Sequence, residues 1–332
     1  MKKLNIVIPH YKEPWDVCWY LFNSIAMQRN VPWEEVTVTI VNDGDDATLD
    51  DVNWSAYPYE VRYFKKPHGG VSAARNYGLD HSEAEYVMFC DIDDGFLNAY
   101  GLHMLFSAME EGFDLLVGAF AEEALATDNK TVMLVGHQYD VTFVHGKAYK
   151  REFLKKYDLR FDNDMTIHED GYFNAVVHTV AIMEKAKIKK IETPFYLWCW
   201  HDNSVVRSQK EDFVLRTYDR LMQTRIGLAK QLKKRGYEEE FKLSVAMTVL
   251  NSYYDFQKTS YWTPENEQNR KKAERAFADF WKRYKKVFYD MTNAKIAEVA
   301  KPARENAYKN GMLMEREDIK TFLKRIDAIC KG

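Results

Sequence analysis

The sequence predicts an α/β fold: a mainly parallel sheet flanked by helices, then an α-helical second domain. Short apolar runs of strand length alternate with helical stretches in the first part, at 4–8, 36–41, 61–64 and 86–90. From about residue 211 onward, helical periodicity replaces the strand pattern. Strands that alternate with helices favour parallel pairing and right-handed connections.

The composition is typical of a globular protein of one large or two ordinary domains. The chain has 332 residues, and 46% of them are hydrophobic. No apolar run approaches the roughly 20 residues that span a bilayer, and residues 1–9 lack the features of a signal peptide. The cysteines are scattered and form no C-x-x-C pair, which argues against a zinc site or a disulfide framework. We therefore expect a cytoplasmic protein.

The net charge of −3 hides an asymmetry between two predicted domains, 1–207 and 208–332. The first contains 20 Lys and Arg against 32 Asp and Glu, and the second contains 27 against 18. A basic second domain would suit an anionic partner, such as a polymer or the inner face of a membrane. The alternative is that the two domains simply attract each other.

The elements of the first domain can be placed in order. We expect helices at about 15–28 and 99–110, a strand at 115–120 and a polar loop at 121–132. The glycines at 69 and 70 precede a helix and could present backbone N–H groups to a phosphate, although a tight turn explains them equally well. Neither G-x-G-x-x-G after the first strand nor a P-loop motif is present.

Three carboxylates follow the apolar run at 86–90 directly: Asp91, Asp93 and Asp94. Ligands of open α/β sheets bind just beyond the carboxyl ends of the strands. Crowded carboxylates repel one another unless a cation lies between them, so this stretch favours a metal site. The alternative is a polar turn at Asp94-Gly95.

Four segments in this order resemble a family 2 glycosyltransferase: Ile6-Val-Ile-Pro-His-Tyr-Lys-Glu13, Val41-Asn-Asp-Gly-Asp45, Gly70-Val-Ser-Ala-Ala-Arg-Asn-Tyr-Gly78 and Asp91-Ile-Asp-Asp94. The resemblance implies the GT-A fold, inversion at the transferred sugar and a nucleotide-sugar donor. The family usually has two acidic residues where this chain has Asn42-Asp43.

The resemblance also implies roles for individual residues. Asp43 and Arg75 would bind a uracil base, which offers a donor flanked by acceptors, and Pro9 and Tyr11 would contact it. Asp91 would contact the ribose or orient the site. Without the resemblance, Arg75 would be assigned to a surface ion pair and Tyr11 to core packing.

A second landmark is Glu169-Asp170, which follows a segment resembling the family's entry to the acceptor side. The resemblance makes Asp170 the general base. Transfer to a hydroxyl with inversion needs one carboxylate to accept the proton, unlike hydrolases, which use two. The alternative is that the acidic pair starts a helix at about 171–180.

The run from Phe195 to Arg207 matches the family's late loop over the diphosphate. His201 would join Asp93 in holding Mn²⁺ or Mg²⁺, and Ser204 and Arg207 would hold phosphate oxygens. A lone histidine beside tryptophan is otherwise a packed or surface residue.

The last third resembles no family. We expect helices at 213–234, 239–258 and 265–290, then two shorter ones, with breaks near Pro264 and Pro302. An aromatic stripe in the third helix fits a core face or a membrane-surface helix; it contains Phe277, Phe280, Trp281, Tyr284 and Phe288.

We therefore expect a metal-dependent, inverting glycosyltransferase that uses a UDP-sugar and a hydroxyl-bearing acceptor such as a cell-surface polysaccharide, teichoic acid or related glycan. Membrane and homo-oligomer contacts are candidate roles for the second domain. A sugar nucleotidylyltransferase is the first alternative, but residues 9–12 form no Gly-rich, Arg-containing loop. The second is a catalytically inactive binder of an anionic polymer.

Overall fold

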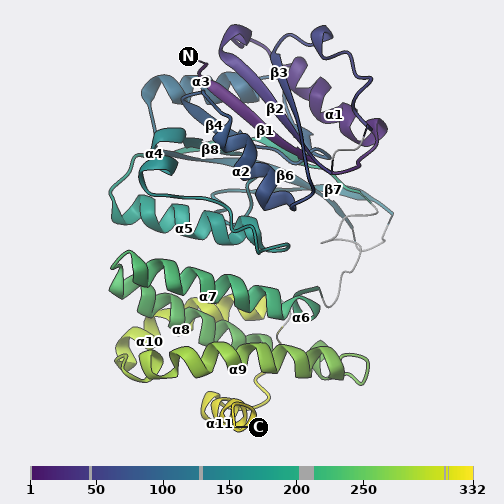
Figure 1. The fold of residues 1–332 in the computed structure, drawn as a ribbon. Helices are drawn as coiled ribbons and strands as arrows, with labels where there is room; N and C mark the ends of the chain where they lie inside the picture. The colour runs from purple at the N-terminus through teal and green to yellow at the C-terminus, as the bar shows by residue number, and fades with distance from the viewer. Residues whose placement is uncertain are drawn as a thin grey trace. The chain divides into compact units, whose positions relative to one another are not determined.

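The structure is a computed structural model that describes residues 2–44, 47–126, 130–201, 213–309, 312 and 314–331. The chain divides into two compact units, Met1–Asp202 and Asn203–Gly332 (Figure 1). The boundary predicted after residue 207 falls in residues 202–212, outside those described.

Among the described residues, the first unit contains a nine-stranded sheet with the spatial order β3-β2-β1-β4-β8-β6-β9-β5, and β7 pairs with β6. The strands are β1 (Leu4–His10), β2 (Val36–Asp43), β3 (Glu60–Lys66), β4 (Tyr86–Phe89), β5 (Gly95–Phe96), β6 (Leu115–Leu125), β7 (Val132–His137), β8 (Lys147–Lys150) and β9 (Ile188–Trp198).

The strand pairing confirms the predicted fold class and adds detail to it. β1 pairs in parallel with β2 and β4, and β2 pairs in parallel with β3. Beyond β4 the sheet is mixed, because β8 is antiparallel to both β4 and β6. The parallel half places the carboxyl ends of β1, β2 and β4 at one edge of the sheet, where ligands of such sheets bind.

The helices of this unit are α1 (Trp15–Ala26), α2 (Val71–Asp80), α3 (Gly101–Glu111), α4 (Arg151–Lys156) and α5 (Glu169–Met183), with short 3₁₀ turns η1 (Trp33–Glu35) and η2 (Trp54–Ala56). Helix α2 lies against β1 and β2. Its approach to β1 is so close that a Cβ atom at Gly78 would overlap Val7 Cγ1. Glycine at this position therefore lets α2 lie directly on the strand.

The predicted loop at 121–132 is wrong over its first part. Strand β6 continues to Leu125 and forms a hairpin with β7. Ala121 and Glu122 also pair with Leu197 and Trp198 of β9. These distant backbone partners hold the segment extended, and its polar composition gives no sign of them.

The second unit is helical, as expected. It contains α6 (Phe213–Arg216), α7 (Tyr218–Lys234), α8 (Glu238–Asp255), η3 (Thr259–Trp262), α9 (Glu267–Tyr289), α10 (Asn293–Lys309) and α11 (Ile319–Ile329). Helix α8 packs against α7, α9 and α10, and α9 also packs against α7 and α11.

The aromatic stripe of α9 forms the core of this unit, which confirms the core interpretation. Phe277, Phe280 and Trp281 are fully buried, and Phe288 is buried beside them. Tyr284 is partly buried against the same cluster. These rings are therefore covered by neighbouring helices.

The predicted break at Pro302 is wrong, because this proline lies inside α10. The helix continues past it, since Val299, Ala303 and Ala307 form a buried face within the core of the unit. Packing of this face compensates for the backbone hydrogen bond that proline cannot donate. Within the described part of the chain, no helix combines the length and apolar character that crossing a bilayer requires.

Candidate active site

The three carboxylates after β4 lie in different surroundings, and Asp94 is the most deeply buried. Its oxygens accept hydrogen bonds from Tyr196 Oη at 2.7 Å and from the backbone N–H of Cys199 at 3.0 Å. Burial raises the pKa of Asp94 well above its ordinary value, and Asp93 and Asp91 add to the rise. Asp94 therefore anchors β9 to the end of β4.

Asp91 is held by two cationic or hydrogen-bonding partners. Arg75 Nη2 lies 2.7 Å from its Oδ1, and His145 Nε2 lies 3.4 Å from its Oδ2. Burial alone would raise the pKa of Asp91, but the arginine and the histidine hold it below its usual range. Asp91 is therefore a carboxylate fixed in its charged form.

Asp93 contacts His201 through its backbone carbonyl, and their shared binding of a metal ion stays a prediction. His201 Nε2 is 2.5 Å from the backbone carbonyl oxygen of Asp93. Burial and the charge of Asp91 raise the pKa of the Asp93 carboxyl, Glu13 adds to the rise, and His201 opposes it. A cation at this point would relieve the repulsion between these carboxylates.

Arg75 joins the two acidic landmarks of the sequence. The arginine projects from α2, is 3% exposed and contacts Glu169 Oε1 through Nη1 at 2.9 Å, while Nη2 contacts Asp91. Its guanidinium also lies over the ring of Phe161. Burial opposes the charge, yet Asp91, Glu169 and Asp170 raise the pKa of Arg75 above its ordinary value. One buried cation thus links β4, α2 and α5.

Asp170 lies in the first turn of α5, beside this network. Its Oδ1 accepts the backbone N–H of Gly171 at 2.7 Å. Burial raises the pKa of Asp170 to about 7, with Glu169 and Asp91 adding to the rise and Arg75 opposing it. A carboxylate with this pKa exchanges a proton near neutral pH, as a general base must.

Asp43 fixes the Gly69-Gly70 turn at the end of β2. Its carboxylate accepts the backbone N–H groups of Gly69 at 2.9 Å and Gly70 at 2.7 Å. Lys66 Nζ bonds the same carboxylate, and His68 Nδ1 lies 2.9 Å from its Oδ2. Gly70 has a φ of 87°, which a side chain would strain.

Pro9 and Tyr11 lie next to this turn. Pro9 pairs with Val41 across β1 and β2, near the end of both strands. Tyr11 is 42% exposed and stacks on His68, with ring centroids 4.3 Å apart. The Tyr11–His68 pair therefore offers an exposed aromatic surface beside Asp43.

The two residues predicted to bind one base are held by different partners. The guanidinium of Arg75 contacts Asp91 and Glu169, whereas Asp43 is bonded to Lys66, His68 and the glycine turn. A shared base contact for Arg75 and Asp43 thus stays a prediction. Ser204 and Arg207 lie outside the described residues.

His145 is a site residue that sequence reasoning missed. It is 3% exposed, lies 3.4 and 3.5 Å from the oxygens of Asp91 and Asp94, and stacks between Phe143 and Tyr196. Burial lowers the pKa of His145, with Asp91 opposing the shift, so a neutral imidazole is favoured. A lone histidine before β8 gives no sequence signal of its approach to β4.

Lys147 is a second missed residue, and it is almost fully buried. Its nearest carboxylate oxygen, on Asp140, is 3.6 Å from Nζ. Among the described residues Nζ has no hydrogen-bond partner. Burial lowers the pKa of Lys147 to about 8, opposed by Asp140 and Asp170. Lys147 thus places a positive charge near Asp170.

Two sets of side chains are candidates for holding a divalent cation, and among the described residues only the second is shown to bring its ligand atoms together. Asp93 and His201 form the predicted pair, and Asp91, Asp94 and His145 offer ligand atoms within 4.8 Å of one another. Both sets combine carboxylate oxygen with imidazole nitrogen, which suits Mn²⁺ better than the all-oxygen preference of Mg²⁺. Nδ1 of His145 is buried without a hydrogen-bond partner among the described residues, whereas metal-bound histidines normally donate their other N–H. This counts against the second set.

Comparison with known proteins identifies relatives over most of the chain. Glycosyltransferase GlyA of Streptococcus pneumoniae is 23% identical over 271 residues, which are 75% of this chain and 37% of GlyA. The poly(ribitol-phosphate) beta-N-acetylglucosaminyltransferase TarS of Staphylococcus aureus is 24% identical over 283 residues, 78% of this chain and 46% of TarS. The chain thus spans less than half the length of both curated relatives.

The fold has a counterpart among solved structures. The crystal structure of S. aureus TarS residues 1–349 in complex with UDP-GlcNAc matches with a TM-score of 0.61 and 18% identity, covering 94% of this chain and 93% of that chain. This likeness supports the predicted fold. The sequence model of glycosyl transferase family 2 matches residues 5–171, about half of the chain. The chain therefore belongs to glycosyl transferase family 2.

Proposed function

We propose that this chain transfers a sugar from a UDP-sugar to an acceptor hydroxyl with inversion. The observation that carries the proposal is that Arg75 pairs with Asp91 after β4 and with Glu169, the neighbour of Asp170, and acts electrostatically on Asp170. These groups are far apart in sequence, and they meet at the edge of the sheet where the strands end. Family membership supports the transferase class.

Asp170 is the proposed general base. Inverting transfer needs one carboxylate that accepts the hydroxyl proton while the acceptor oxygen attacks the anomeric carbon. The pKa of about 7 lets Asp170 take that proton near neutral pH. Arg75 and Glu169 act as positioning residues, since Arg75 bridges Glu169 to Asp91.

The donor is proposed to bind along the ends of β1, β2 and β4. Tyr11 and Pro9 are proposed to contact the base beside the Tyr11–His68 pair. Asp43 fixes the adjacent Gly69-Gly70 turn. Asp91 is proposed to contact the ribose. Ser204 and Arg207 keep their proposed contacts with the diphosphate. The TarS structure that contains UDP-GlcNAc supports a UDP-sugar as the donor class.

Asp93 and His201 are the proposed ligands of Mn²⁺ or Mg²⁺, with Asp91, Asp94 and His145 as the alternative set. When bound, such an ion neutralises charge on the departing diphosphate. The protein's own contribution is to bring Asp93, Asp91 and Glu13 close together. Burial is the largest cause of the raised pKa of Asp93, and repulsion from Asp91 and Glu13 adds to it.

The acceptor is proposed to be a cell-surface glycan or teichoic acid, because the relative TarS is named for transfer to poly(ribitol phosphate). We propose a cytoplasmic location, with contact to an anionic membrane or polymer through the basic second unit. Self-association through that unit is a further proposal. Its excess of Lys and Arg supports contact with an anionic partner.

Asp170→Asn tests the proposal. We expect a loss of transfer of about 10²- to 10⁴-fold, with binding of the UDP-sugar retained. The matched control is Asp164→Asn, which changes an exposed aspartate nearby. The measurements are product formation across a panel of UDP-sugars with Mn²⁺ and calorimetric titration with UDP. Unchanged transfer in Asp170→Asn would overturn the assignment.

A further inference from the structure

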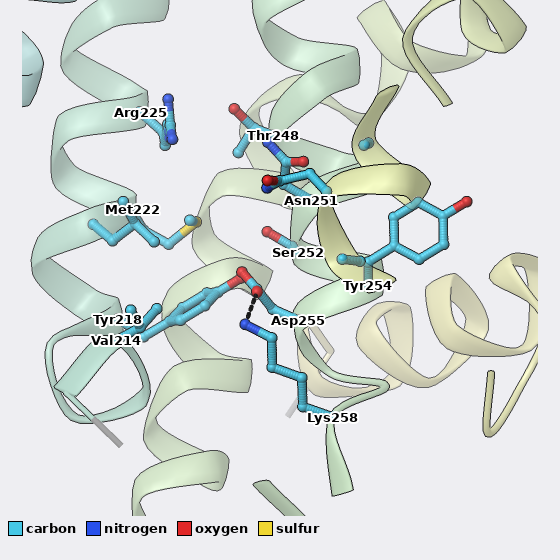
Figure 2. Close-up of a pocket in the computed structure, with 14 residues that line it drawn as sticks. Val214, Tyr218, Met222, Arg225, Thr248, Asn251, Ser252, Tyr254, Asp255 and Lys258 are labelled. Atoms are coloured by element: carbon cyan, nitrogen blue, oxygen red, sulfur yellow. Dashed lines mark hydrogen bonds and ion pairs between the residues drawn. The ribbon is translucent and has the colours of Figure 1, made fainter. Parts of the chain in front are cut away.

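A pocket of about 470 Å³ lies among the helices of the second unit. Figure 2 shows α7 residues on one side, including Arg225, Met222 and Tyr218, and the polar side chains of α8 facing them. Residues of α10 complete the lining, among them Ala303 and Ala307. The pocket lies wholly within residues 214–307 and contains none of the proposed site residues.

The charges in this pocket do not balance. Asp255 and Lys258 form an ion pair at 2.8 Å, drawn as a dashed line in Figure 2. Arg225 is half-buried, and among the described residues it has neither an ion pair nor a hydrogen bond. Burial lowers the pKa of Arg225, although Tyr218 and Asp255 act in the opposite direction. One positive charge is therefore left over.

Uncharged polar groups are also left with unused hydrogen-bonding capacity. The buried hydroxyls of Tyr218 and Ser252 have no hydrogen-bond partner among the described residues other than each other. Thr248 donates its hydroxyl to the backbone of Ser244, so its oxygen can still accept. Asn251 lines the same wall of α8. Buried polar groups in this state are costly unless a ligand or water satisfies them.

We propose that this pocket binds a phosphodiester that carries hydroxyl groups. Arg225 holds the single negative charge, because a guanidinium forms paired hydrogen bonds with phosphate oxygens. Asn251, Ser252 and Tyr218 bind the remaining oxygens and the neighbouring hydroxyls. The site belongs to the helical unit and does not depend on the transferase activity.

The geometry favours a phosphodiester over two other ligand classes. A neutral sugar would cover the half-buried Arg225 and leave its charge unmatched, which is unfavourable once water is displaced. A planar carboxylate directs its oxygens to one side, whereas a tetrahedral phosphate offers oxygens to α7 and α8 at once. The donors lie on both helices, with Arg225 on α7 and Asn251 on α8.

The test is calorimetric titration of the full chain with glycerophosphoglycerol, a hydroxyl-bearing phosphodiester, at low salt and without a nucleotide sugar. We expect binding that Arg225→Gln weakens by about 10- to 100-fold. The matched control is Arg283→Gln, which removes the same charge from an exposed position on α9 and should leave binding unchanged. Because Arg225 is unpaired, its replacement should not lower the unfolding temperature.

Three results would overturn the proposal. The first is absence of binding at millimolar diester. The second is equal binding of glycerol or glucuronate, which would assign the pocket to hydroxyl groups or carboxylates. The third is equal weakening by Arg225→Gln and Arg283→Gln, which would indicate surface charge alone. Asp170→Asn should bind the diester like the wild type, so a failed transferase assay and a failed pocket are distinguishable.

A separate experiment distinguishes the two possible sources of the diester, a lipid headgroup and a soluble polymer. Co-sedimentation with phosphatidylglycerol vesicles that is lost in Arg225→Gln would support the site and assign it to a lipid headgroup. Binding of free glycerophosphoglycerol without co-sedimentation would support the site and assign it to a soluble polymer. Co-sedimentation that persists in Arg225→Gln, without binding of the free diester, would contradict the pocket.

Discussion

Arg75 in the sheet unit is buried and Arg225 in the helical unit is half-buried, and their surroundings differ. Arg75 contacts two carboxylates, Asp91 and Glu169, at 2.7 and 2.9 Å. Arg225 has no carboxylate within ion-pair distance among the described residues. A buried cation that the fold itself needs is matched by anions of the fold. A cation without such a match indicates a ligand from outside.

The helical unit also contains an arginine that forms ion pairs with carboxylates, so the lack of an ion pair at Arg225 is not general in this unit. Arg325 contacts Glu274 and, at 2.6 Å, Glu317. This arrangement joins α9, α11 and the segment before α11 in the same way that Arg75 joins α2, β4 and α5. The lack of a carboxylate within ion-pair distance of Arg225, among the residues that the structure describes, is thus a local property of the pocket.

The largest expected effect separates these two arginines by stability. Arg75→Ala leaves Asp91 and Glu169 without their cation, so we expect the free energy of unfolding to fall by about 3–5 kcal/mol. Arg225→Gln should change it by less than about 1 kcal/mol. Denaturant unfolding of both variants measures the difference. Similar losses in the two variants would break the comparison.

A second prediction distinguishes the two candidate metal sets of the sheet unit. Asp93→Asn should weaken Mn²⁺ binding by at least about tenfold, because it removes a proposed ligand. His145→Gln should leave Mn²⁺ affinity nearly unchanged, since His145 is not among the proposed ligands and lies 3.4 Å from Asp91. Electron paramagnetic resonance titration of Mn²⁺ in the presence of UDP gives the affinities. A larger loss in His145→Gln would transfer the assignment to the Asp91, Asp94 and His145 set.

A third prediction concerns pH. Burial first, then Glu169 and Asp91, raise the pKa of Asp170 to about 7, so transfer should increase as pH rises through about 7 and the base loses its proton. Between about pH 4 and 7 the folded state keeps a proton on Asp170 that the unfolded state has lost. The contribution of this group to stability therefore falls as the pH rises from about 4 to about 7. Asp170→Asn should therefore become more stabilising, relative to wild type, as the pH rises over this range. Unfolding at pH 5 and 8 tests the sign.

The smallest expected effect comes from Lys147, the buried cation near Asp170. Removing its charge in Lys147→Met should raise the pKa of Asp170 further and shift the midpoint of the pH–activity curve upward by less than about one unit. Lys155→Met, at an exposed position, is the control. A downward shift would contradict the electrostatic contact between Lys147 and Asp170.

Much of the sheet unit could be predicted because its signals are local. The apolar runs predicted β1, β2 and β4, and the ligand position of such sheets predicted a site at the carboxyl end of β4, where Asp91 lies. The partners of Arg75 could not be predicted, because they depend on how α2 is rotated on the sheet. His145 was missed because its approach to Asp91 follows from β8 pairing antiparallel with β4.

The helical unit shows a different limit. Its periodic stretches predicted the helices and the buried stripe of α9, since a face that packs on neighbours repeats every turn. Its pocket could not be predicted, because it depends on side chains of α7, α8 and α10 that meet only after packing. Pro302 shows the same limit, because its helix is held by contacts outside the local sequence.

The turn at Gly69-Gly70 has a consequence for how nucleotide preference could change in evolution or by engineering. Its backbone is fixed by Asp43, and the φ of 87° at Gly70 excludes most replacements there. Tyr11 and His68 are exposed beside it, and of the two only His68 contacts Asp43. For the base site proposed here, substitutions that alter base preference without loss of folding should therefore accumulate at position 11 rather than in the turn.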